Sequence, residues 1–440
     1  MINSKKIFAI AKEKNIEPFE LQSSLSTSVT IKVFMDEVES YNIANNSEIR
    51  AKGIIDGKIG SFSSDKVANS IAPMMFDAIE ETAKYGKEYD SEFFIEPGRK
   101  YHRPKHYISS LDRIDVKEYL ELCRRISQKV REKEKRITIT SVFLEYEKKR
   151  SKIENSKGLK LMDHRNHLFI YCTTKYDYQG EIQSGFEYQI IDDFAKFDED
   201  EFVNRVIKKT IAQVGAKPVK SGKYTVLFNP ECTSILLLPI LSHLSQYSVN
   251  KHLSRLEKQL NQLTFSKKLT IVENPFAKNI FGAVYDAEGV PTTKKVLIDK
   301  GTINCFYSDL ESAKEAGTES TGNASYSQGN VKPAVGFCAL KRGKKSFDET
   351  LAYIKNGIYI TDLEGVGTGL SMQTGNYSLQ ADGFLIKDGK LDRAVSLITV
   401  AGNVFDDFKR IAVVSSDSEI TLQGISTPPL AIRKLSISGK

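Results

Sequence analysis

The sequence has little of what marks secreted and membrane proteins. Its five cysteines lie far apart in a chain of 440 residues, and no Cys-x-x-Cys pair occurs. This spacing argues against a disulfide framework, zinc knuckles and thioredoxin-type motifs, and it favours a reducing compartment. The longest apolar run, Ile235–Leu241, contains Pro239 and is too short to cross a bilayer. The apolar patch near the N-terminus is soon interrupted by Lys12, Glu13 and Lys14, so it does not fit a signal peptide. We therefore expect a cytoplasmic protein without membrane contact.

Motifs for phosphate binding and nucleophilic catalysis are also missing. Every Gly-Lys pair lacks the glycine that the Walker pattern places five residues earlier. The run Gly365-Val-Gly367-Thr-Gly369 lies in a β-rich neighbourhood without a βαβ unit, so we interpret it as a glycine-rich turn. Gly-x-Ser-x-Gly is absent, which argues against a nucleophile elbow. The residues alone therefore indicate no nucleotide site and no catalytic serine.

The charge excess is small for a chain of this length. Lysine and arginine number 63 against 56 aspartates and glutamates, a formal net charge of +7. This balance permits an acidic partner without requiring one. The densest basic run, Lys341–Lys345, has no aromatic platform or known reading motif beside it, so we do not expect nucleic-acid binding.

The composition is that of a globular protein with room for several cores. Apolar residues make up 40% and charged residues 27% of the chain. Changes in pattern predict an N-terminal α+β domain over residues 1–90, a central α+β domain over 108–216 and a β-rich domain over 221–440. The fold class we expect is α+β, with mixed sheet domains first and a partly barrel-like C-terminal domain last.

Local patterns predict individual elements. In the first two domains they indicate short strands over 29–33, 38–41 and 49–55, a helical stripe over 67–79, and a helix after the possible N-cap Asp115. We also expect a polar turn around His164 and His167. In the third domain the clearest helices are Pro239–Leu263 and Asp348–Ile354, the latter with Gly357 as its C-cap.

The six histidines do not form a recognisable metal motif. The pairs His102/His106 and His164/His167 lack the His-Glu-x-x-His arrangement and are interpreted as surface residues. His243 stands alone on an apolar helix, whereas catalytic zinc needs about three protein ligands. Cys232 and Cys338 lie in strand-like contexts and are interpreted as small core residues.

Several runs, in order, resemble one family. They include Lys278-Asn-Ile-Phe-Gly-Ala-Val-Tyr-Asp-Ala-Glu-Gly-Val290, Thr374-Gly-Asn-Tyr-Ser378, Ala381-Asp-Gly-Phe384 and Ile398-Thr-Val-Ala-Gly-Asn403. Further matching stretches are residues 38–41, 60–64, 155–158, 298–307, 320–324 and 363–368. Together they are similar to the TldD/PmbA family, also called the TldD/TldE proteins, over nearly the whole chain.

The resemblance implies a two-subunit metalloprotease that encloses a chamber and trims unfolded peptides, including precursors of peptide antibiotics. Its TldD-type subunit carries a His-Glu-x-x-x-His motif and a C-terminal cysteine, whereas its PmbA (TldE)-type subunit lacks both. Here the expected helix, Ser234–Ser248, offers only His243 as a lone remnant. Leu244 takes the glutamate position, Ser248 takes the second histidine position, and Asp417–Thr427 contains no cysteine.

The resemblance therefore implies a PmbA-type, non-catalytic subunit with no metal or cofactor of its own, and it assigns no catalytic or substrate-binding residues. Zinc is expected in a TldD-type partner, and unfolded peptides are the expected substrates. Heterodimer and homodimer both stay open. The alternatives are a regulatory protein of the DNA gyrase modulator type, or a stand-alone metallopeptidase with relocated ligands that include His243 or His252.

Overall fold

The computed structural model describes residues 3–102, 107–277, 279–327 and 329–440. The chain forms two compact units. The first unit comprises Met1–Ile211 with Lys278–Ile280, and the second comprises Ala212–Ala277 with Phe281–Lys440. Within the described ranges, no helix is long and apolar enough to pass through a lipid bilayer.

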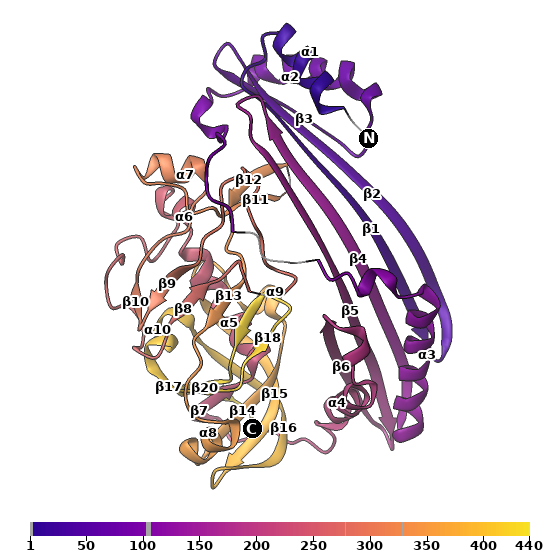
Figure 1. Cartoon of the computed structure of the whole chain (residues 1–440). Helices are drawn as coiled ribbons and strands as arrows, with labels where there is room; N and C mark the ends of the chain where they lie inside the picture. The colour runs from indigo at the N-terminus through magenta and orange to yellow at the C-terminus, as the bar shows by residue number, and fades with distance from the viewer. Residues whose placement is uncertain (1–2, 103–106, 278, 328) are drawn as a thin grey trace. The chain divides into compact units, whose positions relative to one another are not determined.

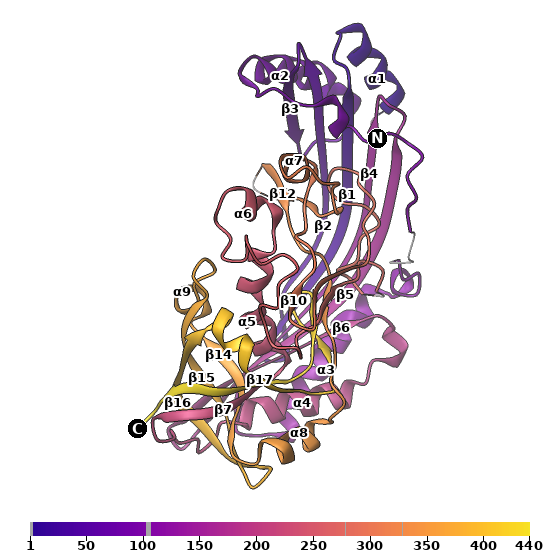
Figure 2. The same ribbon diagram turned by 90° about the vertical axis from the view of Figure 1, so that its left-hand side faces the viewer.

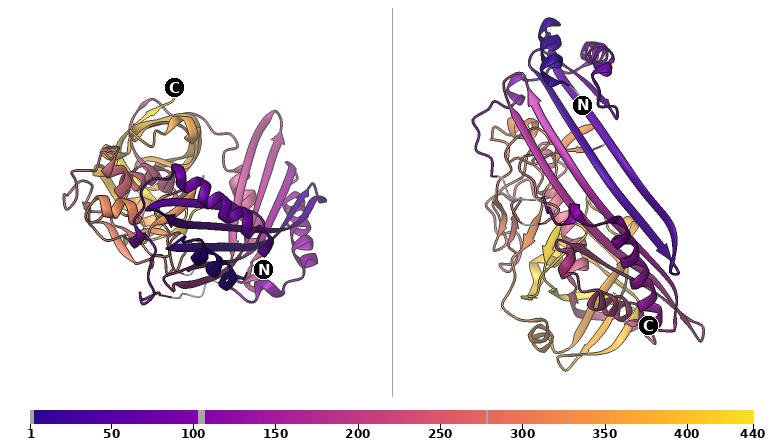
Figure 3. Two further views of the ribbon diagram at one scale, coloured as in Figure 1. Left: turned by 90° about the horizontal axis from the view of Figure 1, so that it is seen from above. Right: turned by 45° about the vertical axis from the view of Figure 1, so that its right-hand side comes forward.

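The first unit is built on one six-stranded antiparallel sheet with the order β3-β2-β1-β4-β5-β6. Figures 1 and 3 show its middle strands as long curved arrows. The strands are β1 Phe19–Phe34, β2 Glu37–Ile55, β3 Lys58–Ser64, β4 Ile137–Asn155, β5 Lys160–Tyr178 and β6 Glu181–Ile191. Because β1 pairs with β4 along nearly its whole length, strands of the predicted N-terminal and central domains share this sheet. The division into those two domains stays a prediction.

Helices of the first unit cover two separate stretches of the sheet. Near one end, α1 Ser4–Glu13 and α2 Ala72–Tyr85 pack on β1, β2 and β3 around Phe19 and Phe76. Elsewhere, α3 Val116–Lys133 and α4 Glu199–Ile211 pack on β1, β4, β5 and β6 around Ile126 and Phe202. One sheet therefore carries two hydrophobic cores. Short 3₁₀ turns are η1 Asn69–Ile71, η2 Ser91–Phe93, η3 Leu111–Arg113 and η4 Phe194–Lys196.

Two sequence predictions for this unit are wrong. The strands predicted over 38–41 and 49–55 are one strand, β2, because the polar residues between them keep their backbone pairing with β1. The turn predicted around His164 and His167 is instead part of β5, where the same residues pair with Arg150 and Glu147 of β4. In both places cross-strand hydrogen bonding overrides a polar local pattern.

The second unit contains a closed barrel of five strands. The sheet order is β16-β15-β14-β7-β20-β17, and an additional pairing of β16 with β20 closes the ring. Figure 2 shows the barrel strands β7, β14, β15 and β16 near the C-terminus. The partly barrel-like architecture expected for this region is confirmed. The five barrel strands are β7 Gly222–Phe228, β14 Gly357–Glu364, β15 Asn376–Lys387, β16 Lys390–Asn403 and β20 Leu430–Ser438. The sixth strand of the sheet, β17 Ile411–Val414, pairs with β20.

A second sheet packs with the barrel around one large core. Its order is β10-β9-β8-β13-β19-β18, and α5 contributes Leu237 and Ile240 to the shared core. Its strands are β8 Ile271–Glu273, β9 Lys295–Asp299, β10 Thr302–Ile303, β13 Cys338–Leu340, β18 Glu419–Ile420 and β19 Ile425–Thr427. A separate hairpin joins β11 Ala324–Ser327 and β12 Asn330–Pro333. The helices are α5 Pro230–His243, α6 Gln246–Asn250, α7 Leu310–Glu315, α8 Phe347–Ile354, α9 Val366–Gly369, α10 Val404–Asp407 and η5 Phe408–Arg410.

The helix predicted over Pro239–Leu263 is wrong. Helix α5 begins earlier and ends at His243, α6 ends at Asn250, and residues 251–263, all described, are not helical. The C-cap predicted at Gly357 is also wrong, because Lys355 is the C-cap of α8, with a φ of 62°. Gly357 opens β14, where a β-carbon would come within 2.3 Å of the Thr225 carbonyl oxygen. Close strand packing explains the glycine there.

Candidate functional site

Helix α5 carries the residue that sequence analysis singled out. Its first turn is fixed by Asn229, whose side chain accepts a hydrogen bond from the Cys232 amide at 2.8 Å and donates to Thr361 O at 2.8 Å. Pro230 occupies the first turn, where its missing N–H costs nothing. The helix is apolar almost all round, which is typical of a helix buried within a core. His243 is its last residue.

Both ring nitrogens of His243 are hydrogen-bonded to backbone. Its Nδ1 accepts from the Arg255 amide at 2.8 Å, so Nδ1 carries no proton. Nε2 therefore carries the proton and donates to the carbonyl oxygens of Gln373 at 3.0 Å and Met372 at 3.2 Å. The ring is buried and meets Phe405 edge-on at 5.0 Å. Burial lowers the pKa of His243, and the nearby Arg255 cation lowers it further.

The neighbouring motif positions do not add ligands to His243. Leu244 is fully buried in the core of the second unit. Ser248 lies on α6, where its carbonyl accepts from the amides of Leu253 and Ser254. Because the chain leaves the helix after His243 and starts α6 at Gln246, these positions do not share one continuous helix face. The residues present here do not fit zinc, since the one imidazole has no lone pair free in this arrangement.

The C-terminal stretch 417–427 does lie against α5, at the opposite end from His243. Gln423 Oε1 accepts from Ser234 Oγ at 2.9 Å, and Thr427 Oγ1 donates to Pro230 O at 2.7 Å. In both of these contacts the stretch meets the helix through neutral oxygen atoms. Within the part of the chain that the structure describes, no group of three or more His, Cys, Asp or Glu side chains is placed to hold a metal ion.

The other predicted histidines that the structure describes have contacts of their own. His164 stacks on Tyr107 at 3.8 Å and His167 lies 3.4 Å from Glu145 on the first unit's sheet. His102 is exposed, and its predicted companion His106 lies outside the described residues. His252 is exposed and lies 3.0 Å from Glu257. The interpretation of Cys232 and Cys338 as core residues is confirmed by their complete burial.

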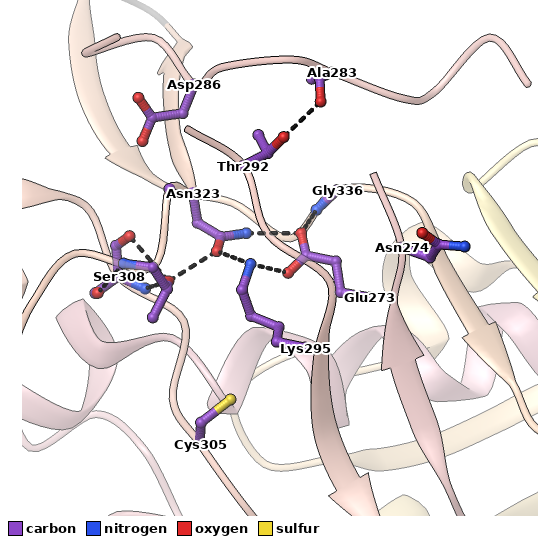
Figure 4. Close-up of polar contacts among 12 residues, drawn as sticks. Glu273, Asn274, Ala283, Asp286, Thr292, Lys295, Cys305, Ser308, Asn323 and Gly336 are labelled. Atoms are coloured by element: carbon purple, nitrogen blue, oxygen red, sulfur yellow. Dashed lines mark hydrogen bonds and ion pairs between the residues drawn. The ribbon is translucent and has the colours of Figure 1, made fainter. Parts of the chain in front are cut away.

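Sequence analysis missed a buried ionic network in the second unit. The carboxylate of Glu273 accepts from Lys295 Nζ at 2.7 Å, from Asn323 Nδ2 at 2.8 Å and from the Gly336 amide at 2.6 Å. Lys295 also donates to Asn323 Oδ1 at 2.8 Å. Figure 4 shows these three side chains converging from β8, β9 and the loop before β11. The alternation of apolar and polar residues in β8 is only a weak sign of a buried Glu273. No local pattern predicts its pairing with Asn323, which is fifty positions away.

A second buried carboxylate lies in the same region and is bonded to backbone alone. Asp286 Oδ1 accepts from the amides of Glu288 and Val290, and Oδ2 accepts from the Ala324 amide, all at 2.9 Å. Burial raises the pKa of Asp286 to about 6, although these three donors act in the opposite direction. Thr292 donates to Ala283 O at 2.6 Å and closes the turn (Figure 4). These contacts fix the positions of the loops that carry Asp286 and Thr292.

Cys305 is the one partly exposed thiol of this region in the described chain. It lies near Lys295 (Figure 4), and its Sγ is 3.6 Å from Val296 O. Burial raises its pKa despite the lysine. Reactive cysteines have lowered pKa values, because the thiolate is the nucleophile. The contacts of Glu273 with Lys295, Asn323 and Gly336 position the loops of the second sheet.

Several solved structures of prokaryotic proteins share this architecture. A Thermotoga maritima protein described as a candidate modulator of a DNA gyrase superposes with a TM-score of 0.91, at 25% identity and 99% coverage of each chain. TldE from Thermococcus kodakarensis gives a TM-score of 0.88 at 21% identity, covering 99% of this chain and all of that one. The fold is thus that of the TldE and gyrase-modulator structures.

Family models and curated relatives agree with this class. The model described as the PmbA/TldA metallopeptidase central domain matches residues 109–214, and that of the C-terminal domain matches residues 221–439. The chain therefore belongs to the PmbA/TldD family.

The relatives differ in how much of their length is matched. Metalloprotease PmbA of Escherichia coli O157:H7 is 23% identical over 438 residues, which cover 96% of this chain and 92% of that protein. A metalloprotease of Methanothermobacter thermautotrophicus is 31% identical over 225 residues, half of this chain, and the chain spans 49% of that relative's length.

Proposed function

We propose that this chain is the PmbA-type, non-catalytic subunit of a cytoplasmic two-subunit metalloprotease that processes unfolded or precursor peptides. A TldD-type subunit would hold the zinc and activate water for attack on the peptide carbonyl. The observation that carries the proposal is the hydrogen bonding of His243. Both its ring nitrogens are hydrogen-bonded to backbone groups, so the one histidine retained at the motif position has a structural role.

The surroundings of His243 support the same assignment. Leu244 offers no carboxylate to act as a general base, and Ser248 offers no imidazole. The stretch 417–427 reaches α5 through Gln423 and Thr427, neither of which is a thiolate. A hydrolytic zinc site needs about three protein ligands with an open position for water. His243 is the one imidazole described at this place, and its Nδ1 lone pair already accepts from the Arg255 amide.

In this proposal the chain contributes walls and peptide-binding surface to a closed chamber. An extended peptide would add as a strand to a sheet edge, where backbone hydrogen bonds give affinity without demanding a sequence. The second sheet offers such an edge, since β18 ends its strand order. Selectivity for unfolded substrates follows from access, because only an extended segment enters an enclosed space.

Metal content and peptide cleavage, measured with and without a partner, test the proposal. The purified chain alone should bind less than a tenth of an equivalent of zinc and should not cleave an unfolded peptide. Mixing it with a TldD-type subunit that carries the His-Glu motif should produce cleavage. Stoichiometric zinc and cleavage by the isolated chain would refute the proposal, and so would an inactive mixture in which the two subunits demonstrably associate.

A pair of substitutions separates a structural His243 from a hidden ligand. His243→Ala should leave the zinc content of the active mixture unchanged, whereas alanine at the first motif histidine of the TldD-type partner should abolish it. The graft L244E/S248H should not create a zinc site, because α5 ends at His243 and the three positions do not share one helix face. Zinc binding by the graft would show that the helix continues through this region.

A second candidate function is regulation of DNA gyrase, which the description of the Thermotoga maritima structure favours. Gyrase or DNA retained by the chain at physiological salt, and still retained after a moderate salt increase, would support this function. Loss of binding over that range would indicate non-specific charge attraction. A stand-alone metallopeptidase that uses His252 and Glu257 is tested by the metal content of the isolated chain.

A further inference from the structure

The segment that follows α6 has the sequence of an amphipathic helix. Val249, Leu253, Leu256, Leu260 and Leu263 recur at spacings of four, three, four and three residues. On a helix this spacing places all five side chains on one narrow stripe. The residues between them include Arg255, Glu257, Lys258 and Gln259, which are good helix formers. The local sequence therefore favours a helix through residues 249–263.

The structure holds the same segment in another conformation. All of residues 251–263 are described, and they form turns and isolated bridges. His252 and Asn261 adopt left-handed backbone angles, with φ of 55° and 61°, which cost free energy for residues other than glycine. Leu253, Leu260 and Leu263 stay 51%, 42% and 58% exposed. Local preference and observed fold thus disagree, as they do at functional or strained segments.

His243 supplies the contacts that oppose the helix. In a continuous helix the Arg255 amide would bond to the Lys251 carbonyl, four residues earlier. Here that amide donates to His243 Nδ1 at 2.8 Å, and Ser254 Oγ donates to the His243 carbonyl at 2.6 Å. Leu256, by contrast with the other leucines, is buried in the core. These contacts hold the middle of the segment against the end of α5.

The same histidine also holds a second loop, residues 371–375. Its Nε2 donates to the carbonyls of Met372 and Gln373. Arg255 reaches the adjacent Thr374 carbonyl with Nη1 at 2.6 Å, and its guanidinium lies over Phe405 at 5.0 Å. Opening the contacts of His243 would therefore release both the 251–263 segment and the 371–375 loop.

We infer that residues 251–263 are a two-state segment, latched by His243 in the observed conformation and helical when the latch opens. The helical state recovers regular backbone hydrogen bonds and relieves the two left-handed residues. It gives up the burial of Leu256, the bonds to His243 and the backbone bonds of Asn261 and Gln262 with Ile303. Since the other leucines are already exposed in the latched state, helix formation removes little further apolar surface from the core. The latch couples the segment to the 371–375 loop.

A matched pair of double variants tests the inference on the chain alone. Alanine disfavours the left-handed conformation and favours helix, whereas glycine does the reverse. H252A/N261A should raise the ratio of helical to latched molecules by about tenfold over H252G/N261G, seen as a higher helix content by far-UV circular dichroism. Both variants remove the same side chains, including the contact of His252 with Glu257. Equal helix content in the two variants, or a higher content in the glycine variant, would overturn the inference.

His243→Ala tests the coupling. Exchange should change in both segments, residues 251–263 and 371–375, while the barrel strands β14 and β15 stay protected. A change in only one of the two segments would contradict the latch. If this variant does not fold, the alanine and glycine pair still decides between one state and two. None of these measurements involves a partner or cleavage, so their failure is distinct from failure of the proposed function.

Discussion

The two units bury their apolar side chains in different ways. The first unit spreads one sheet under two separate groups of helices, and each group has its own core, around Phe76 and around Ile126. In the second unit the barrel, the second sheet and α5 share one continuous core, around Leu237. This difference indicates that a core substitution in the first unit destabilises only the elements around that core. In the second unit a core substitution should destabilise both the barrel and the second sheet.

The largest effect we expect comes from breaking the buried network of the second unit. Lys295→Ala leaves Glu273 buried without its cation, which should lower the free energy of unfolding by about 3–5 kcal/mol. Chemical denaturation followed by circular dichroism measures it. Lys84→Ala, which removes a surface pair with Glu81, is the control and should cost less than about 0.5 kcal/mol. A loss below about 1 kcal/mol for Lys295→Ala would mean that the network is dispensable.

Truncation of core isoleucines and of one core leucine tests whether the cores of the first unit are separate and that of the second unit is shared. Ile79→Ala and Ile126→Ala should each destabilise their own core by about 2–4 kcal/mol through a cavity. Hydrogen exchange should rise only in the helices and strands around the substituted residue. Leu237→Ala should instead raise exchange in both the barrel and the second sheet. If Ile79→Ala loosened α3 and α4 as well, the two cores of the first unit would be one cooperative structure.

Substitution of Asp382 should make the barrel less sensitive to pH. Burial raises its pKa to about 6, with Glu364 and Asp362 contributing, and its Oδ1 has no hydrogen-bond partner among the described residues. Because the folded-state pKa lies above the unfolded value, this group stabilises the fold most at low pH, and that contribution is lost as pH rises through about 6. Asp382→Asn should therefore raise stability at pH 7.5 by about 1–2 kcal/mol.

Asp286 is the control for that prediction, since its pKa is also about 6 but its carboxylate accepts three backbone bonds. Asp286→Asn cannot accept all three and should destabilise the protein at every pH. Thermal melts between pH 4.5 and 8 distinguish the two cases. Destabilisation by Asp382→Asn at pH 7.5 would show that its charge is satisfied by a group other than those described.

The smallest effect expected concerns a helix end of the first unit. Asp115 accepts a hydrogen bond from the Lys117 amide at 2.9 Å as the N-cap of α3. Asp115→Ala should cost about 1 kcal/mol, with faster exchange in the first turn of α3. Glu121→Ala, which removes only an exposed pair with Arg124, should leave that turn unchanged. No change in either variant would mean that packing alone holds the helix start.

Sequence patterns predicted the parts of the fold whose causes are local. The N-cap at Asp115 and the helix ending at Ile354 depend on neighbouring residues, and both are found. The β-rich C-terminal region was predicted from glycine turns and short strands. The pairing of β16 with β20, which closes the barrel, could not be predicted from the sequence. Its residues Thr399 and Ser438 meet only after the whole barrel has formed.

The candidate site shows the same limit. Counting motif positions identified His243, Leu244 and Ser248 as a depleted ligand set. The partners of His243 were not predictable, since they are backbone atoms of Arg255, Met372 and Gln373. Glu273 and Lys295 were missed for a similar reason, because a charged residue within a strand is ordinary until its partner is known.

By itself, the sequence determined the family, the mixture of helices and strands, and the lack of a carboxylate and a second histidine beside His243. These follow from residue identity and spacing along the chain. Tertiary structure alone decided that His243 bonds to two loops, that Glu273 is neutralised by Lys295, and that residues 251–263 leave the helix their spacing favours. Each of these outcomes depends on long-range contacts, which can outweigh the fraction of a kilocalorie per residue that local preference supplies.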